Sequence, residues 1–342
     1  MKPPPPESGL IIVDKPSGWT SHDVVGKLRR LAGTRRVGHA GTLDPMATGV
    51  LVIGVEKATR LLGHLALTEK VYEATIRLGV TTDTDDAEGR VLAVTAADGV
   101  SREAVEAGVA ALTGRIMQIP PQVSAIKVDG KRAYKRARAG EDVELSARPV
   151  TVYAFEVTAL RPAEHAEPPA EHENLDDGAR SAPEAHPGGE PSGRADDAAH
   201  AAVAVGGGSA GRPVLDVDVT VRCSSGTYIR SLARDLGERL GVGGHLTYLR
   251  RTRVGPYDVS SARTIEQLAD KCEILPMAQA VAAAFPRRDV SAEQARVVAH
   301  GGRLPAAGLG DGPIGVFGPD GTLLALVEEK GGQARALAVF AP

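Results

Sequence analysis

The 342-residue chain has few cysteines, few aromatic residues and no long hydrophobic run. Its two cysteines, Cys223 and Cys272, cannot build a disulfide framework, which favours a reducing compartment. No apolar run reaches the roughly 18 residues of a membrane span, and residues 1–6 lack the apolar core of a secretory leader. We therefore expect a cytoplasmic protein with no membrane association.

An excess of charge of one sign is also missing, because the formal net charge is only −3. Taken alone, this value argues against a nucleic-acid partner. The charge is unevenly distributed, however: residues 161–212 carry a net charge of −6 and the remainder carries +3. The basic residues gather in three stretches, 15–60, 115–138 and 222–253. These stretches could form one positive surface for RNA or three separate solvated faces.

Residues 161–212 differ in composition from the rest of the chain. They hold 13 Ala, 8 Gly and 6 Pro, and no aromatic residue. Such a segment buries too little apolar surface to offset its ordering entropy, so we expect an acidic, disordered insertion. Four of the nine histidines lie here, but their irregular spacing argues against a metal site.

Hydrophobic periodicity and turn signals predict a chain of mixed strands and helices. No regular alternation of strand and helix occurs, so the main body is expected to be α+β. From residue 287, short aliphatic runs separated by Gly-rich turns predict a small β-rich module. The expected strands are 9–13, 50–53, 72–78, 90–95, 116–128, 149–160, 214–223 and 245–254. The expected helices are 20–31, 56–66, 102–113, 131–139, 227–240, 264–270 and 276–284, and residues 33–49 are expected to form a loop.

The loop at 35–49 carries the most chemical information. It is rich in glycine, and its carboxylate, Asp44, is the only acidic residue between Asp23 and Glu56. An isolated carboxylate beside arginine and histidine should stay ionised and could act as a nucleophile or a general base. The local pattern also fits an Asp-Pro turn in which the aspartate caps its own backbone. The glycines do not have the spacing of a phosphate-binding P-loop.

This loop resembles the catalytic motif G-[HR]-x-G-x-L-D-P-x-A-x-G of the bacterial tRNA pseudouridine synthase B (TruB) family. Four further segments resemble motifs of the same family, in the same order along the chain. Together they cover about residues 15–160 and 213–255. The matching segments are 14–21 (DKPSGWTS), 70–72 with 78–89 (KVY, LG and TDTDDAEG), 120–134 (PPQVSAIK and GKRAY), and 223–230 with 248–251 (CSSGTYIR and YLRR).

The resemblance implies a fold and a domain organisation. Residues 1–286 would form a pseudouridine synthase domain with a mixed, largely antiparallel sheet and flanking helices, interrupted by the 161–212 insertion. Residues 287–342 would form a PUA-like RNA-binding domain; this part of the match rests on position, length and β-rich pattern.

The resemblance also implies an activity: conversion of the T-loop uridine at tRNA position 55 to pseudouridine. The base would be flipped out, detached from the sugar, turned and rejoined through carbon, without metal or cofactor. The implied partner is the T arm of tRNA rather than DNA, and we expect a monomer.

Three catalytic residues are implied by the matched motifs. Asp44 would be the essential carboxylate, adding to the sugar or removing a proton from it. Arg230 would hold Asp44 ionised and in position; without the family it is equally a surface arginine. Tyr72 would stack on the base and act as general base late in the reaction; without the family it is an inward-facing aromatic of a strand.

Four residues would bind the substrate. Tyr228 and Leu249 would line the base pocket, although a leucine in a strand also fits core packing. His39 would contact the RNA where the uridine has left its stack, and Lys15 would support the loop or a phosphate rather than take part in the chemistry. The chain departs from the family pattern at Val123, where an aromatic residue is usual.

Three other functions remain open on the sequence. A non-catalytic RNA-binding module could keep the fold, but it need not keep Asp44, Tyr72 and Arg230 together. The archaeal and eukaryotic relatives that work in guide-RNA particles carry a larger C-terminal domain with basic tails. A glycosidase normally uses two carboxylates, whereas this loop offers one.

Overall fold

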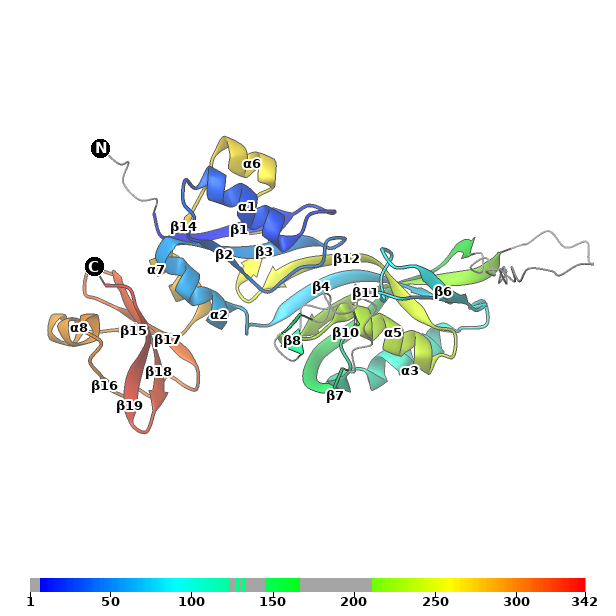
Figure 1. Cartoon of the computed structure of the whole chain (residues 1–342). Coiled ribbons are helices and arrows are strands. Elements are labelled where there is room, and N and C mark those ends of the chain that lie inside the picture. Colours follow the sequence, from blue (N-terminus) through cyan, green and yellow to red (C-terminus); the bar gives the residue numbers. More distant parts are fainter. Residues whose placement is uncertain (1–6, 123–126, 129–130, 133–144, 167–210, 342) are drawn as a thin grey trace, which may run out of the picture.

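The computed structural model describes residues 7–122, 127–128, 131–132, 145–166 and 211–341. Its main body is built on one sheet with the strand order β14-β1-β3-β12-β4-β11-β10-β7, which β13 extends beside β12 and β2 beside β3 (Figure 1). All of these pairs are antiparallel except β12 with β3. The predicted α+β class with a mixed, largely antiparallel sheet is confirmed. The strands are β1 (Gly9–Lys15), β2 (Val37–Ala40), β3 (Thr48–Val55), β4 (Lys70–Leu78), β7 (Gly114–Gln118), β10 (Arg148–Ala166), β11 (Arg212–Cys223), β12 (Gly244–Val254), β13 (Tyr257–Asp258) and β14 (Leu275–Pro276).

Helices cover the sheet in three separate hydrophobic clusters. Helices α3 and α5 pack on β4, β10, β11 and β12, and α1 and α6 pack on β1 and β3. A third cluster joins η1, α2 and α7 to the opposite face of β1 and β3. The helices are α1 (Ser21–Leu31), η1 (Glu56–Leu61), α2 (Leu62–Leu65), α3 (Arg102–Ala111), α5 (Ile229–Arg239), η2 (Val259–Ser261), α6 (Ile265–Asp270) and α7 (Met277–Ala284).

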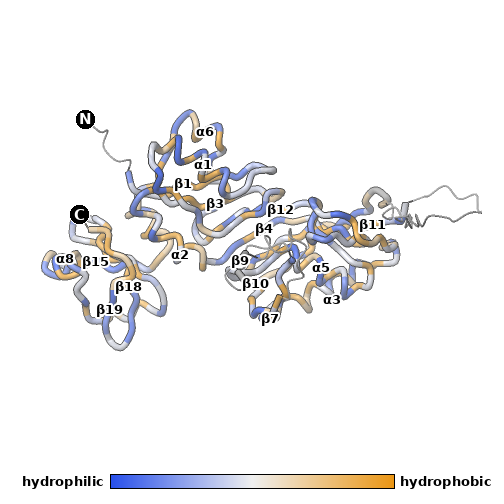
Figure 2. Tube along the Cα trace, in the orientation of Figure 1, coloured by the Kyte–Doolittle hydropathy of each residue, from blue (hydrophilic) through white to orange (hydrophobic). Residues whose placement is uncertain are grey.

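The C-terminal residues form the expected β-rich module. Its five-stranded sheet has the order β15-β17-β18-β19-β16, with α8 packed against it. In Figure 2 the tube has the orange colour of hydrophobic residues along much of β1 and of the first half of β18. Phe317 and Leu326 belong to the same cluster as β1 and α7, so the module docks on the main body through apolar packing. Its elements are β15 (Arg287–Asp289), α8 (Ala292–Ala299), β16 (Leu304–Pro305), β17 (Pro313–Phe317), β18 (Leu323–Lys330) and β19 (Gln333–Val339).

Two predictions about secondary structure need correction. The predicted loop 33–49 contains strand β2, which pairs with β3 from Val37↔Val55 to Ala40↔Val52. Two glycines and a histidine in and around this strand interrupt the apolar pattern by which strands are predicted, although Val37 and Ala40 are buried. The predicted 116–128 strand is shorter, since β7 ends at Gln118, and residues 127–128 form β8 (Lys127–Val128).

The predicted bounds of the acidic insertion are also wrong, at its first six residues and at its last residue, Arg212. Strand β10 continues to Ala166 and pairs with β11 as far as Ala166↔Arg212. Arg161 forms ion pairs with Asp216 (3.2 Å) and Asp218 (2.9 Å), and Ala163 packs on a small hydrophobic cluster. Ion pairing and packing therefore extend the hairpin into a segment whose composition predicts disorder.

Other parts of the sequence predictions lie outside the described residues. These are residues 167–210 of the insertion, Val123, and most of the predicted helix 131–139, whose first two residues form strand β9 (Lys131–Arg132). Strands β5 (Val80–Thr82) and β6 (Val91–Val94) form a separate hairpin. In the part of the chain that is described, no helix is long and apolar enough to cross a membrane.

Candidate active site

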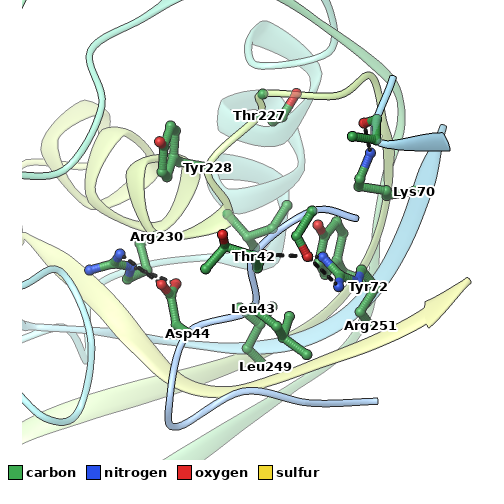
Figure 3. A pocket seen from close by; sticks show the side chains of 14 residues that line it. Thr42, Leu43, Asp44, Lys70, Tyr72, Thr227, Tyr228, Arg230, Leu249 and Arg251 are labelled. Carbon is green, nitrogen blue, oxygen red and sulfur yellow. Dashed lines mark hydrogen bonds and ion pairs between the residues drawn. The ribbon is translucent and has the colours of Figure 1, made fainter. Parts of the chain in front are cut away.

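A pocket of about 240 Å³ lies where four segments of the main body meet (Figure 3). One side consists of residues 41–44 of the loop that connects β2 to β3. The others are the strands β4 and β12 and the start of helix α5. The pocket therefore gathers segments that are far apart in the sequence. Five of the seven predicted site residues line it: Asp44, Tyr72, Tyr228, Arg230 and Leu249.

The Asp44 carboxylate points toward helix α5 rather than capping its own turn. The Arg230 Nε atom lies 3.1 Å from one Asp44 oxygen, and Arg230 Nη2 donates to the other at 3.2 Å. This two-point contact fixes both the position and the orientation of the carboxylate. The Asp44 side chain remains 33 % exposed, whereas the Arg230 side chain is 5 % exposed, so the carboxylate faces the pocket and its partner is buried behind it.

Arg230 is held in place by a second carboxylate that the sequence analysis missed. Asp86 lies 3.2 Å from Arg230 Nη1, and the same nitrogen donates to the Thr84 carbonyl at 2.9 Å. Asp86 is itself fixed by hydrogen bonds from the Thr84 hydroxyl (2.6 Å) and the Glu88 amide (3.1 Å). The acidic motif at 82–89 thus builds a turn whose buried carboxylate orients Arg230.

Tyr72 lies on β4 with its ring buried in the pocket wall, since the residue is 6 % exposed. Burial raises the pKa of the phenol above its usual value, and the neighbouring Arg251 guanidinium opposes this rise. Leu249, on the adjacent strand β12, is 5 % exposed and completes the apolar wall. A flat ring beside an aliphatic side chain is suited to enclosing a planar base.

Tyr228 sits at the N-terminus of α5, and its backbone is fixed by a residue that the sequence did not reveal. Gln118, at the end of β7, accepts from the Tyr228 amide (2.8 Å) and donates to the Tyr228 carbonyl (3.0 Å). Gln118 is 2 % exposed. This pairing positions the start of α5, from which both Tyr228 and Arg230 extend.

Lys15 supports the catalytic loop from behind and does not line the pocket. Its ammonium group is fully buried and donates to the carbonyls of Pro16 (2.9 Å), Trp19 (2.6 Å) and Pro45 (3.0 Å). Burial lowers the pKa of Lys15 to about 8, although Asp44 opposes this effect. Of the two predicted roles for Lys15, the geometry favours loop support over a contact with substrate.

The loop is fixed from the other side by Ser21 and Arg251. The Ser21 hydroxyl donates to the Leu43 carbonyl (3.1 Å) and accepts from the Leu43 amide (3.0 Å). Arg251, which is 1 % exposed, donates to the carbonyls of Gly41 (3.0 Å) and Thr42 (3.3 Å). The loop around Asp44 is therefore held by side chains from β1, α1 and β12.

His39 lies on β2 outside the pocket lining. Its ring is partly exposed and meets the His22 ring edge-on, with the ring centres 5.6 Å apart. The structure thus brings Asp44, Tyr72, Tyr228, Arg230 and Leu249 together, and leaves His39 and Lys15 near the pocket but not in it.

Much of the third basic stretch is engaged within the folded protein. In 222–253, Arg230 and Arg251 are buried, and the stretch also holds ion pairs to Glu69, Asp85 and Asp14. The second stretch lies mostly outside the described residues. The first presents exposed arginines on α1 and the turn after it: Arg29, Arg30, Arg35 and Arg36.

Comparisons with known proteins agree with this arrangement. Residues 29–169 match the TruB family pseudouridylate synthase N-terminal domain, 230–281 the tRNA pseudouridylate synthase B C-terminal domain, and 285–341 the tRNA pseudouridine synthase II C-terminal domain. A tRNA pseudouridine synthase B of Thermobifida fusca is 57 % identical over 97 % of this chain and 98 % of that protein. The chain belongs to the TruB family. It is accordingly an isomerase that forms pseudouridine in RNA.

Other TruB relatives and solved structures support the same placement. A tRNA pseudouridine synthase B of Mycobacteroides abscessus is 46 % identical over 100 % of this chain and 99 % of its own length. Among solved structures, a Cbf5-Nop10-Gar1 complex contains a chain that is 26 % identical, with a TM-score of 0.63, over 98 % of this chain and 84 % of that one. The structural similarity confirms the predicted pseudouridine synthase fold.

Proposed function

We propose that this TruB family member converts the T-loop uridine at tRNA position 55 to pseudouridine, with Asp44 as its essential carboxylate. The observation that carries the proposal is the position of Asp44, which the buried Arg230 holds at a pocket walled by Tyr72, Tyr228 and Leu249. A base inside folded RNA must leave its stack to reach such a pocket.

The reaction breaks the bond between uracil N1 and the sugar C1′, with the bonding electrons leaving on the base. Asp44 relieves the electron deficiency at C1′ either by adding to the sugar or by taking a proton from it. The detached base turns within the pocket, and its C5 atom forms a new bond to C1′. Tyr72 then accepts the proton from C5 while N1 gains a proton, so the product is an isomer of the substrate.

The proposed substrate contact extends beyond the pocket to the T arm. The exposed arginines of α1 and the following turn are suited to RNA phosphates, and His39 lies on the next strand. We further propose that residues 1–286 act as the catalytic domain and 287–342 as a PUA-like RNA-binding domain, in a cytoplasmic monomer that needs no metal or cofactor.

Two features favour an isomerase over the other functions. Asp44, Tyr72 and Arg230 are all present and converge, which a binding-only module would not require. The second carboxylate of the site, Asp86, is 3 % exposed and is engaged by Arg230, so it is not available as the second acid of a glycosidase.

The test is to incubate the protein with an unmodified tRNA transcript and to map pseudouridine by position. We expect product at position 55 with the wild-type chain and none with Asp44→Asn, while the affinity for tRNA is retained. Absence of product with the wild type, or equal product with the variant, would contradict the proposal. Arg230→Ala should lower turnover more than tRNA affinity, and equal losses would indicate a binding role.

A further inference from the structure

Two cationic side chains, Lys70 and Arg251, line the pocket on the side away from Asp44. Figure 3 shows Asp44 with Arg230 on one side of the pocket and Lys70, Tyr72 and Arg251 together on the other. Lys70 is 6 % exposed and Arg251 is 1 % exposed. Neither residue has a role in the reaction proposed above.

Both cations are solvated by neutral carbonyl groups. Lys70 Nζ donates to the carbonyls of Ala66 (2.8 Å) and Thr68 (2.7 Å). Arg251 donates to Gly41, Thr42 and, through Nε at 2.8 Å, to Val50. Within the described part of the chain neither one forms an ion pair with a carboxylate, whereas Arg230 has two such partners. Burying a charge without a counter-charge costs several kcal/mol. This wall therefore holds positive charge at an energetic cost, with no carboxylate of the described residues paired to it.

The register of the sheet places both cations beside Tyr72. Arg251 on β12 is the direct cross-strand partner of Tyr72 on β4. Lys70 is two residues before Tyr72 on the same strand, so its side chain lies on the same face of the sheet. Gly41 lies against both cations: a Cβ atom there would be at ordinary contact distance, 3.5 Å from Lys70 Cε and 3.7 Å from Arg251 Nη1.

We propose that Lys70 and Arg251 stabilise the negative charge that uracil carries once its bond to the sugar is broken. The inference rests on the function proposed above. When the N1–C1′ bond breaks, the electron pair remains on N1 and spreads to O2 and O4 of the ring. That charge persists while the base turns and until C5 bonds to C1′. Fixed cations in a buried site stabilise such a species far more than water-exposed ones.

A phosphate of the target nucleotide is the other anion that these cations could hold. The near-complete burial of both residues disfavours it, since a phosphate stays at the mouth of a base pocket while the base enters its depth. A phosphate contact would act on tRNA affinity, whereas stabilisation of the uracil anion acts on the chemical step.

The experiment compares single-turnover rates on two tRNAs, one with uridine and one with 5-fluorouridine at the target position. Fluorine withdraws electrons, so the fluorinated ring carries the negative charge more readily and depends less on the enzyme. We expect Lys70→Met to slow glycosidic cleavage of the uridine substrate by about 10²-fold. The loss should be several-fold smaller with 5-fluorouridine, and Lys70→Arg, which keeps the charge, should restore most of the rate on uridine.

Lys15→Met is the matched control, because Lys15 is also a buried lysine bound to backbone carbonyls near Asp44 but does not line the pocket. Its effect should be the same on both substrates. Equal losses for Lys70→Met on the two tRNAs, equal rates for Lys70→Met and Lys70→Arg, or a loss confined to tRNA affinity would each overturn the inference. If the wild-type chain converts uridine in the same assay, such a result counts against the inference and not against the proposed function. Thermal melting checks that each variant is folded.

Discussion

The Gln118 side chain pairs with the backbone of Tyr228 through two hydrogen bonds, one in each direction. The pairing ties the end of β7 to the first residue before α5, where the helix has no side-chain cap. It is reinforced by Ser231, whose hydroxyl donates to the Ile119 carbonyl at 2.9 Å. The position of Tyr228, and of Arg230 two residues later, therefore depends on a glutamine outside the pocket lining.

We predict that Gln118→Ala destabilises the protein and misplaces the start of α5. Each buried backbone group left without a partner costs about 1–3 kcal/mol. Urea denaturation should show the loss of stability, and kcat should fall because Arg230 no longer orients Asp44 well. Gln118→Glu separates the two hydrogen bonds, because its carboxylate can still accept from the Tyr228 amide but cannot donate to the Tyr228 carbonyl. An Ala variant as stable and active as the wild type would contradict this role.

The second prediction concerns Asp86. Asp86→Asn keeps the size of the side chain but removes the second negative charge beside Arg230. Small misplacements of a reacting group can lower the rate by about 10²-fold, so we expect a loss of kcat of that order with tRNA affinity unchanged. Asp83→Asn provides the comparison, since Asp83 lies in the same acidic motif but contacts Arg90 and not Arg230. Equal activity of the two variants would show that Arg230 does not need Asp86.

Features set by local sequence could be predicted in detail. Helix α1 occurs within the predicted range 20–31 and begins at a capping box formed by Thr20 and Asp23, and strands β1 and β4 occur at their hydrophobic runs. The pairing of Asp44 with Arg230 spans 186 residues and was predictable only through the resemblance to the family. The geometry of this pair depends on how the fold brings helix α5 next to the loop that carries Asp44, and no local sequence pattern encodes that tertiary contact.

The residues that were missed share a physical cause. Arg251 was counted in a basic stretch, yet it is among the largest fully buried side chains in the described chain. Its hydrogen-bond partners are backbone carbonyls, and backbone groups carry no signal in the sequence. The same holds for Gln118.

Burial of Lys70 predicts a pH dependence of stability. Burial and the neighbouring Arg251 lower the pKa of Lys70 from 10.5 to about 8, opposed weakly by Cys223. Between pH 8 and 10.5 the unfolded chain holds a proton that the folded chain has released, so rising pH favours folding through this group. The free energy of unfolding of the wild type minus that of Lys70→Met should therefore rise by up to about 3 kcal/mol across this window.

The comparison with Lys70→Met removes the titration of other groups, which both proteins share. Guanidinium denaturation at several pH values measures the difference. It should be flat below pH 8, where Lys70 is charged in both states. A difference that stays constant up to pH 10.5 would show that Lys70 keeps an ordinary pKa in the folded chain.

Gly49 links the stability of the sheet to the position of Asp44. It lies opposite Arg251 in the short parallel contact of β3 with β12 and has a φ of +99°. A Cβ atom there would lie 2.2 Å from the Arg251 carbonyl oxygen, so Gly49→Ala must push the two strands apart. Gly114 has a similar φ of +94° with no atom near its Cβ position, so Gly114→Ala isolates the backbone strain, about 1–3 kcal/mol.

We expect Gly49→Ala to be more destabilising than Gly114→Ala in urea denaturation. It should also lose activity under conditions where it remains folded, because displacing Arg251 releases the carbonyls of Gly41 and Thr42 and with them the loop that carries Asp44. Equal stability and activity of the two variants would refute this coupling.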